Sequence, residues 1–274
     1  AILTQQNVAK LFIAAFVPGV LAAVGYMVAI AIYVRLYPQS AGSSPRQKWR
    51  ERMSALADVW PVLCLFLIVV GGIYAGWFTP TEGAAVGAAG SGLIALFNGG
   101  LTRKTLIEAI LATATSTAMI FFIVFGAAMY NSFLALSQLP VEAAAYITGQ
   151  GLSPWTVLAG ILVFYLVLGC FMDSLSMILL TVPVFFPLVS GLDFGMGAED
   201  FAIWFGILVL VVVEVGLITP PVGMNLFVIN SMAKDIPILA TYRGVTPFII
   251  SDVVRMLLLL AFPALTLFMV KWLY

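Results

Sequence analysis

Residues 210 to 230 read LVLVVVEVGLITPPVGMNLFV, which sets two consecutive prolines inside a run otherwise apolar enough to cross a lipid bilayer. A proline lacks the N–H that a helix uses and clashes with the carbonyl group four residues earlier, so Pro220 and Pro221 force the helix to stop and restart. Backbone groups left unpaired by such a break are tolerated at membrane depth only where protein or a polar cavity surrounds them. An interrupted membrane helix of this kind is typical of an ion or solute site in a secondary transporter.

The composition of the chain indicates an all-α polytopic membrane protein. Its 274 residues are 63% hydrophobic and 9% charged, with a mean hydropathy of +1.13, far outside the range of soluble domains. Twelve basic and twelve acidic residues cancel, so no net charge indicates a nucleic-acid partner. The lack of histidine excludes HExxH zinc sites and Ser-His-Asp catalysis. We expect no enzymatic activity and no cofactor.

Two further features concern the cysteines and the start of the chain. Cys64 and Cys170 both lie in apolar segments, where a buried thiol packs as a small hydrophobic group, so no disulfide is expected. The first residue is Ala, and no signal peptide precedes the first apolar span. A truncated or processed chain is therefore expected.

The first part of the chain alternates apolar spans with short polar segments. A requirement of about 20 apolar residues per crossing predicts spans over 11–37, 59–78, 83–97 and 106–136. The polar loop 38–58 contains Arg46, Lys48, Arg50 and Arg52, and the positive-inside rule places it in the cytoplasm. The turn Thr79-Pro80-Thr81-Glu82 separates the second span from the third, and 140–153 is expected to be an external loop.

The segment from Pro154 to Ser190 is predicted to be a re-entrant hairpin. Its two apolar arms, 155–168 and 175–189, flank the polar sequence GCFMDSLS. Each arm has roughly 15 residues and a length of about 22 Å, which is short for a hydrocarbon core of about 30 Å. A broken helix over 201–233 then returns to the cytoplasm, a short surface helix contains Arg243, and a last span over 247–270 leaves the C-terminus in the periplasm.

Three motifs carry a family resemblance. The sequences GLITPPVGMN at 216–225, FTPTEGAAVGA at 78–88 and GCFMDSLSMILLTVPVFFPL at 169–188 resemble the large membrane subunit of tripartite ATP-independent periplasmic (TRAP) transporters, the DctM-like family. The resemblance runs along the whole chain, yet it covers only the C-terminal portion of such a subunit. Family members carry a first inverted repeat upstream.

The resemblance implies a sodium-coupled secondary transporter of the bacterial inner membrane that imports organic anions such as C4-dicarboxylates or sialic acids. The expected partners are a small DctQ-like membrane subunit, a periplasmic substrate-binding protein, the organic anion and membrane lipid. The implied fold is similar to the elevator-type ion transporter superfamily. Residues 1–78 then correspond to scaffold helices and 79–153 to linking helices. The hairpin 154–190 and the broken helix 201–233 correspond to the transport domain, followed by the surface helix and last span in 237–274.

The polar residues of the hairpin tip and the break are candidate site residues. Asp173 at membrane depth needs a neutralising partner or a bound cation. Carbonyl groups freed at the break are hard oxygen ligands of the kind that Na⁺ prefers, and the start of the second half-helix near Val222 favours an anion. We expect the cation to be bound by Asp173, Gly169, Gly216, Thr219 and Asn225, with Na⁺ at Asp173 and Thr219. The substrate residues are expected to be Ser174, Pro220, Pro221, Val222 and Gly223.

Several alternatives stay open. One alternative is that Asp173 is the N-cap of the second hairpin arm and has no other role. Glu214 is either a second polar anchor or the partner of a basic side chain. The segment 79–82 either forms a local turn with a structural role alone or also has a functional role. Asp252 and Arg255 lie three residues apart and are expected to pair. An ion-coupled antiporter or export pump of the same architecture, or a nontransporting assembly subunit, also fits the sequence.

Overall fold

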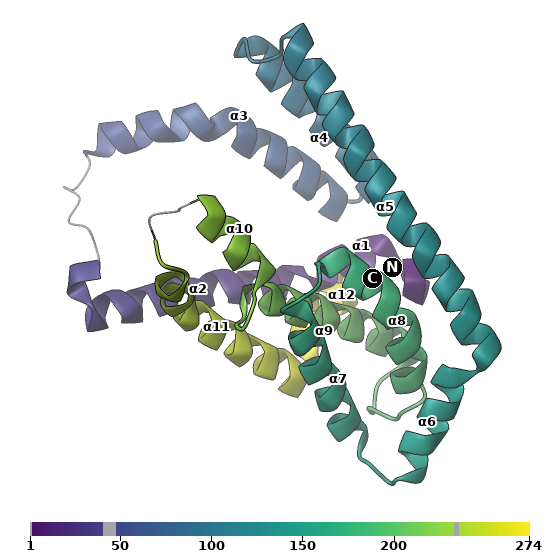
Figure 1. The fold of residues 1–274 in the computed structure, drawn as a ribbon. Coiled ribbons are helices and arrows are strands. Elements are labelled where there is room, and N and C mark those ends of the chain that lie inside the picture. Colours follow the sequence, from purple (N-terminus) through teal and green to yellow (C-terminus); the bar gives the residue numbers. More distant parts are fainter. Residues whose placement is uncertain (1, 41–47, 233–235) are drawn as a thin grey trace. The chain divides into compact units, whose positions relative to one another are not determined.

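The computed structural model describes residues 2–40, 48–232 and 236–274, and these residues form helices joined by short connections, with no strand among them (Figure 1). The expected all-α architecture is therefore confirmed. The α-helices are α1 (Val8–Ala14), α2 (Phe16–Leu36), α3 (Trp49–Tyr74), α4 (Pro80–Phe97), α5 (Arg103–Ser137), α6 (Leu139–Gly149), α7 (Pro154–Gly169), α8 (Ser174–Ser190), α9 (Ala198–Ile218), α10 (Met224–Met232), α11 (Ile238–Ala261) and α12 (Ala264–Leu273). Short 3-10 helices cover Ile2–Thr4 and Pro38–Ser40.

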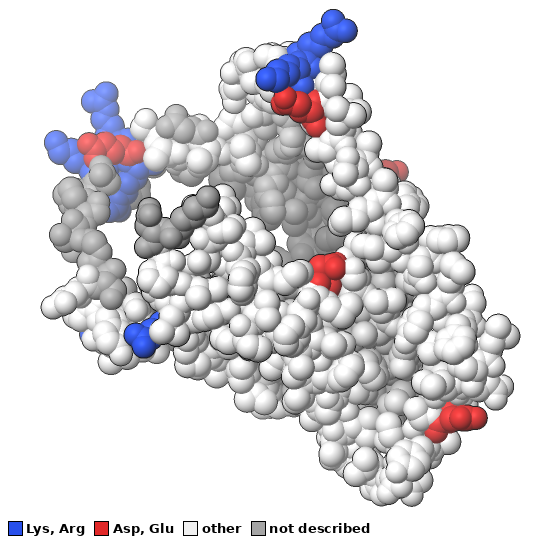
Figure 2. Space-filling view, viewed as in Figure 1, with Lys and Arg blue, Asp and Glu red and all other residues white. Residues whose placement is uncertain are grey.

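Within the described residues, four segments are helical, long and apolar enough to cross a membrane. They are Val8–Leu36, Arg103–Ser137, Ala198–Ile218 and Ile238–Ala261, and the bent pair Trp49–Ala57 and Val59–Tyr74 makes a fifth if it is counted as one span. Figure 2 shows a surface that is mostly free of charged side chains on the face drawn. The helix over the expected span 83–97 forms as α4 but is not one of the four, because its 18 residues include the polar start Pro80-Thr81-Glu82 and several glycines, which lower its hydropathy.

The chain divides into two compact units, 1–40 with 123–274, and 41–122. In the smaller unit α3 packs against α4. Gly83 lies against Ile73, and Gly87 lies against Val69. Small residues on α4 thus allow the two helices to approach closely, as is common between membrane helices.

The larger unit is built around α9, most of whose side chains are buried. Trp204, Phe205, Leu208 and Val213 have no exposed surface. The α7, α8, α10, α11 and α12 helices all contact α9. A helix that is apolar on all sides is stable only when other helices surround it. The sequence of α9, rich in Val, Leu and Ile, therefore places it at the centre of this unit.

The start of α9 is held by two ion pairs. Glu199 and Asp200 lie in its first turn, where acidic side chains interact favourably with the helix dipole. Lys10 of α1 pairs with Glu199, and Lys271 of α12 pairs with Asp200 at 2.7 Å. These contacts fix both ends of the described chain to the same helix terminus.

A buried polar cluster joins α2 to α11. The expected pair of Asp252 and Arg255 is confirmed, with Arg255 Nη2 lying 2.9 Å from Asp252 Oδ1. The hydroxyl of Tyr26 donates to Asp252 Oδ2 at 2.7 Å, and Asp252 is only 2% exposed. The Arg255 contact is an ion pair without hydrogen-bond geometry, since Asp252 Oδ1 and Arg255 Nε have no hydrogen-bond partner among the described residues.

Two helix boundaries differ from the sequence prediction in the first half of the chain. The α3 helix begins at Trp49, ten residues before the expected span, so part of the expected loop 38–58 is helical. Residues 41–47 of that loop, which contain Arg46, lie outside the described residues. Leu139–Gly149 forms the helix α6 inside the expected external loop. Its Pro at the second position, its acidic first turn and its three consecutive alanines are all favourable for a helix.

The last expected boundary is also displaced. Residues 238–261 form one helix through Pro247, so Arg243 lies on the same helix as the expected last span and not on a separate surface helix. The break falls at Phe262 and Pro263 instead, where Phe262 has φ −127° and ψ 77°. Pro263 cannot donate to the carbonyl group of Leu259, and the Trp204 indole N–H donates to that oxygen at 2.9 Å. The buried carbonyl group is thereby satisfied.

Candidate functional site at the hairpin tip and the helix break

The α7 and α8 helices form the two arms of the expected hairpin. Ser153 caps α7 by accepting from Thr156 N, and Asp173 caps α8 by accepting from Ser176 N at 2.9 Å. A hydrogen bond of 2.8 Å joins the hydroxyls of Tyr165 and Thr181 between the arms. The arms therefore run beside each other, and the tip comprises residues 170–173.

The expected interruption lies between α9 and α10. The α9 helix ends at Ile218 and α10 begins at Met224, close to the start expected near Val222. The peptide bond between Pro220 and Pro221 is cis, and Gly223 has a φ of +61°, a conformation that glycine adopts without the strain of a side chain. Residues 219–223 thus leave the helical path, as the two prolines predict. The end of the expected segment, Ala233, lies outside the described residues.

The hairpin tip packs directly on this break. A Cβ added to Gly216 would lie 2.7 Å from the Cα of Gly169, and one added to Gly169 would lie 2.9 Å from the Cα of Gly216. Beside this contact, the Cys170 thiol lies 3.6 Å from the Pro220 carbonyl oxygen. The structure therefore brings the end of α7, next to the tip, against the backbone of α9 one turn before the prolines.

Most polar groups around the break have partners within the chain. Thr219 N donates to Gly216 O at 3.0 Å, and the Thr219 hydroxyl donates to Val215 O at 2.6 Å. On the far side of the break, the hydroxyl of Tyr242 lies 2.9 Å from both the Pro221 and the Val222 carbonyl oxygens. The Thr219 hydroxyl still has free lone pairs and can act as a ligand.

Three carbonyl groups remain without a partner. No donor from the described residues reaches the carbonyl oxygens of Leu217, Ile218 or Thr219. Pro220 and Pro221 have no N–H group to offer to Leu217 or Ile218, and the chain leaves the helical path before Val222 or Gly223 can donate to Thr219. A Cβ on Gly223 would lie 3.2 Å from Thr219 O and 3.4 Å from Leu217 O. These two oxygens therefore face one small space that Gly223 leaves open, and carbonyl oxygens of this kind are suitable ligands for a hard cation.

The expected ligands are only partly brought together. Gly169 and Gly216 are in contact, and Thr219 lies at the break beside Gly216. Asp173 is exposed at the tip and Asn225 is exposed on α10, and no hydrogen bond joins either of them to Thr219. The structure assigns Asp173 an N-cap role, in which its carboxylate accepts from the backbone N–H of Ser176.

The expected substrate residues lie along the outer edge of the same region. Pro220 and Pro221 are exposed, Ser174 and Val222 are half-buried, and Gly223 is buried. The start of α10 follows Gly223 directly, so its positive dipole end is next to the break. Glu214, one turn before the break, is exposed and makes no ion pair with a described residue.

Two residues with contacts to the break were missed by the sequence analysis. Cys170 was expected only to pack, yet its thiol faces the Pro220 carbonyl group, and it is buried and not in a disulfide. Tyr242 lies twenty residues beyond the break in a segment expected to be a surface helix. No local pattern indicates either contact, because both depend on how helices distant in sequence pack together.

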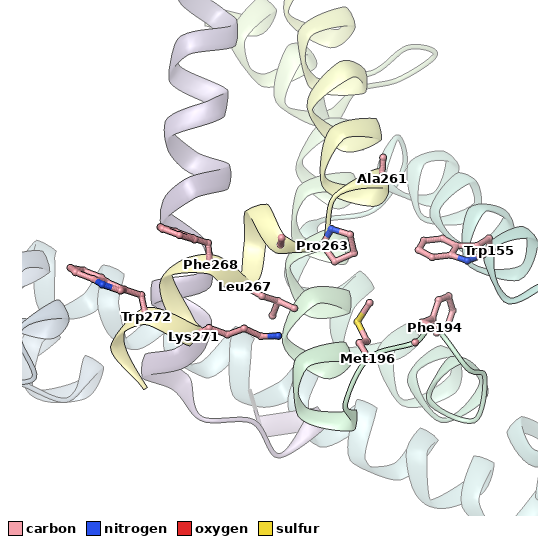
Figure 3. Close-up of a pocket in the computed structure, with 11 residues that line it drawn as sticks. Trp155, Phe194, Met196, Ala261, Pro263, Leu267, Phe268, Lys271 and Trp272 are labelled. Atoms are coloured by element: carbon pink, nitrogen blue, oxygen red, sulfur yellow. The ribbon is translucent and has the colours of Figure 1, made fainter.

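Hollows elsewhere in the larger unit are lined by other residues. One, of about 680 Å³, lies where α11 bends into α12, with Trp155 and Phe194 on one side and Lys271 and Trp272 on the other (Figure 3). Another, of about 430 Å³, lies between the base of the hairpin and the start of α9. Neither contains a residue of the tip or of the break. The described residues contain no cluster of three or more His, Cys, Asp or Glu side chains that could hold a metal ion.

The helical architecture, the hairpin and the interrupted helix can be compared with known proteins. A family model described as the tripartite ATP-independent periplasmic transporter, DctM component, matches residues 1–265. The chain belongs to this family. The resemblance of its three motifs is thereby confirmed, and the chain is a multi-pass membrane protein of a family of transporters and not of enzymes.

Individual relatives are similar over nearly the whole chain. The chain is 37% identical to the C4-dicarboxylate TRAP transporter large permease protein DctM of Pseudomonas aeruginosa over 98% of its length. It is 32% identical to the sialic acid TRAP transporter large permease protein SiaM of Vibrio cholerae over 97% of its length, and 33% identical to the ectoine TRAP transporter large permease protein TeaC of Halomonas elongata over 98%. The chain spans about three fifths of these relatives, 61%, 60% and 61%.

Proposed function

We propose that this DctM-family chain is part of a sodium-coupled secondary transporter that imports an organic anion across the bacterial inner membrane. The observation that carries the proposal is the packing of the hairpin tip on the helix break, with the carbonyl oxygens of Leu217, Ile218 and Thr219 left unpaired beside Gly223. Unpaired carbonyl groups in a membrane protein are costly unless water or a ligand satisfies them. A sodium ion satisfies these carbonyl groups when their oxygens coordinate it.

The proposed cation site adds side-chain oxygens to these carbonyl groups. The Thr219 hydroxyl, whose hydrogen atom is used by Val215, has lone pairs to donate, and Asp173 supplies the negative charge from the hairpin tip. The structure shows no contact between Thr219 and either Asp173 or Asn225. The proposed site therefore requires that sodium binding brings Asp173 and Asn225 towards Thr219. This movement of the tip on cation binding couples the ion to the substrate site.

The proposed substrate is an organic anion bound beside the cation. The start of α10 offers a positive dipole end and the free N–H groups of a first helical turn, which favour a carboxylate. The relatives are named for C4-dicarboxylates and sialic acid, which carry carboxylates, and for ectoine. The cation and the helix terminus together attract the negative charge, while the residues around Ser174 and Val222 contact the rest of the solute.

The proposed mechanism is of the elevator type and uses three proteins. The hairpin and the α9–α10 break move together as a transport domain against scaffold helices that include α2. A periplasmic binding protein delivers the anion, a small membrane subunit supports the scaffold, and lipid surrounds both. The proposed orientation places the basic segment 38–58 in the cytoplasm and the C-terminus in the periplasm.

Uptake into proteoliposomes tests the proposal. The complete large permease is reconstituted with its small subunit, and labelled organic anions are supplied with the cognate binding protein, with or without an inward sodium gradient. Uptake that requires both sodium and the binding protein is the expected result. Uptake that proceeds equally in choline and without the binding protein overturns the proposal and favours an ion-coupled antiporter, for which efflux against a counter-ion is measured next.

A further inference from the structure

The hydroxyl of Tyr242 on α11 reaches the backbone of the break. Its oxygen lies 2.9 Å from the carbonyl oxygens of both Pro221 and Val222, and its single O–H hydrogen is shared between these two acceptors. The first hydrogen bonds of α10 run from Leu226 and Phe227 to Gly223 O. The two carbonyl groups that Tyr242 holds therefore precede the helix and have no helical donor.

We infer that Tyr242 is a positioning residue for the break and that it determines which carbonyl groups are available to a cation. By occupying the acceptors on the α10 side, it confines the unpaired oxygens to the α9 side, at Leu217, Ile218 and Thr219. The inference rests on the proposed sodium site. It adds that a side chain on another helix, with no contact to the ion, sets the geometry of that site.

The geometry of the loop explains why such a residue is needed. Gly223 has a φ of +61° and the chain turns there between two half-helices, so residues 219–223 lack the regular hydrogen bonds that fix a helix. Thr219 N and the Thr219 hydroxyl anchor the end of α9, through Gly216 O and Val215 O. Tyr242 is the side-chain donor that anchors the other end. Without it, the peptide groups of Pro221 and Val222 are free to reorient.

A neighbouring hydrogen bond provides a matched control. The Thr241 hydroxyl donates to Asn230 Oδ1 at 2.9 Å, which joins α11 to α10 through side chains alone. Thr241 and Tyr242 are adjacent, and both fasten α11 to the segment after the prolines. Only Tyr242 touches the backbone of the break. A variant that lacks the Thr241 bond therefore shows how much of any change in sodium binding comes from a weaker contact between α10 and α11 alone.

The experiment compares Tyr242→Phe with Thr241→Val in the complete permease with its small subunit. The sodium concentration for half-maximal uptake is measured in proteoliposomes, and the sodium-induced rise in thermal midpoint is measured on purified protein against choline chloride. Loss of a neutral hydrogen bond predicts a roughly 3- to 10-fold higher half-saturating sodium concentration for Tyr242→Phe and a smaller sodium-induced rise. Thr241→Val is expected to keep the wild-type value for both.

The outcomes separate this inference from the proposed function. A wild-type half-saturating sodium concentration in Tyr242→Phe overturns the inference while leaving sodium coupling in place, and equal shifts in both variants assign Tyr242 a merely structural role. Sodium-independent uptake by the wild type overturns both. If Tyr242→Phe yields too little folded protein, 3-fluorotyrosine at position 242 keeps the ring and makes the O–H a stronger donor. It is expected to lower the half-saturating sodium concentration, and an unchanged value overturns the inference.

Discussion

Gly169 at the end of α7 and Gly216 near the end of α9 meet backbone to backbone, so closely that a Cβ on Gly216 would lie 2.7 Å from the Cα of Gly169. A real Cβ does not approach another backbone to this distance, so the two chain segments can pack this way only because both residues lack a side chain. The contact lies next to the unpaired carbonyl groups of the break. It therefore sets the distance between the hairpin tip and the proposed cation site.

We expect Gly216→Ala to separate the tip from the break. The added methyl group overpacks this contact, and overpacking of this kind costs about 1–3 kcal/mol. A lower thermal midpoint of the purified permease and a loss of sodium-dependent uptake are the expected results. Gly160→Ala on the exposed face of α7 is the control, since a Cβ there has no neighbour within 4 Å and alanine is favoured over glycine inside a helix. Wild-type stability and uptake in Gly216→Ala would show that the close contact is not needed.

The two roles of Asp173 predict different effects for two substitutions. Asn is as good an N-cap as Asp, so Asp173→Asn is expected to keep the stability of the hairpin while removing the negative charge. Asp173→Ala removes the cap as well, at a further cost of about 1 kcal/mol. If Asp173 binds the cation, both variants lose sodium-dependent uptake, although only the alanine variant has a lower thermal midpoint. Intact sodium-dependent uptake by Asp173→Asn would leave Asp173 with the capping role alone.

The interrupted helix and the two hairpin arms could be predicted because their causes are local. Pro220 and Pro221 remove N–H groups wherever they stand, and Asp173 before an apolar run is a good helix start whatever surrounds it. The same local reasoning failed at Pro247. The α11 helix has 24 residues, and the rest of its hydrogen bonds keep it continuous although Pro247 cannot donate to the carbonyl group of Arg243.

The contacts that complete the site could not be predicted because they join segments far apart in the sequence. The approach of Gly169 to Gly216 and the hydrogen bonds of Tyr242 depend on which helix faces pack together, and periodicity says little in helices that are apolar on all sides. The α6 helix is different. The sequence contains local signals for this helix, namely a Pro near its start, Glu142 in its first turn and several alanines. The prediction of an external loop there rests instead on the position of the segment between two expected membrane segments.

The cluster of Tyr26, Asp252 and Arg255 is expected to stabilise the pairing of α2 with α11. Asp252→Ala leaves the guanidinium of Arg255 without its counter-charge in a site where that side chain is 13% exposed, and breaking a buried pair costs about 3 kcal/mol. Arg255→Ala is expected to be less harmful, because the Tyr26 hydroxyl still donates to Asp252. Thermal midpoints of both single variants and the double variant form a mutant cycle. We expect the double variant to be less destabilised than the sum of the singles, and strict additivity would show that the pair contributes nothing.

The capping box at the start of α4 predicts a dependence of stability on pH. Glu82 Oε2 accepts from Thr79 N and from the Thr79 hydroxyl, both at 2.8 Å. The bond from the Thr79 backbone has the larger effect and the bond from its hydroxyl the smaller, and together they hold the pKa of the Glu82 carboxyl below its ordinary value of 4.5. A carboxyl group whose pKa is lowered in the folded state stabilises the protein above its unfolded pKa, and this contribution is lost as the pH falls through the folded pKa. The advantage of the wild type over Glu82→Gln is therefore expected to be full at neutral pH and to shrink below about pH 4.5.

Thermal midpoints of the purified permease between neutral pH and the acid limit of its solubility measure this difference. Glu142→Gln is the control, because Glu142 lies in the first turn of α6, is exposed and accepts no hydrogen bond from a described residue. Its difference from the wild type is expected to stay small over the same range. A gap between the wild type and Glu82→Gln that stays constant down to the acid limit would mean that the charge of Glu82 does not strengthen the cap, and the bonds to Thr79 would then act as neutral ones.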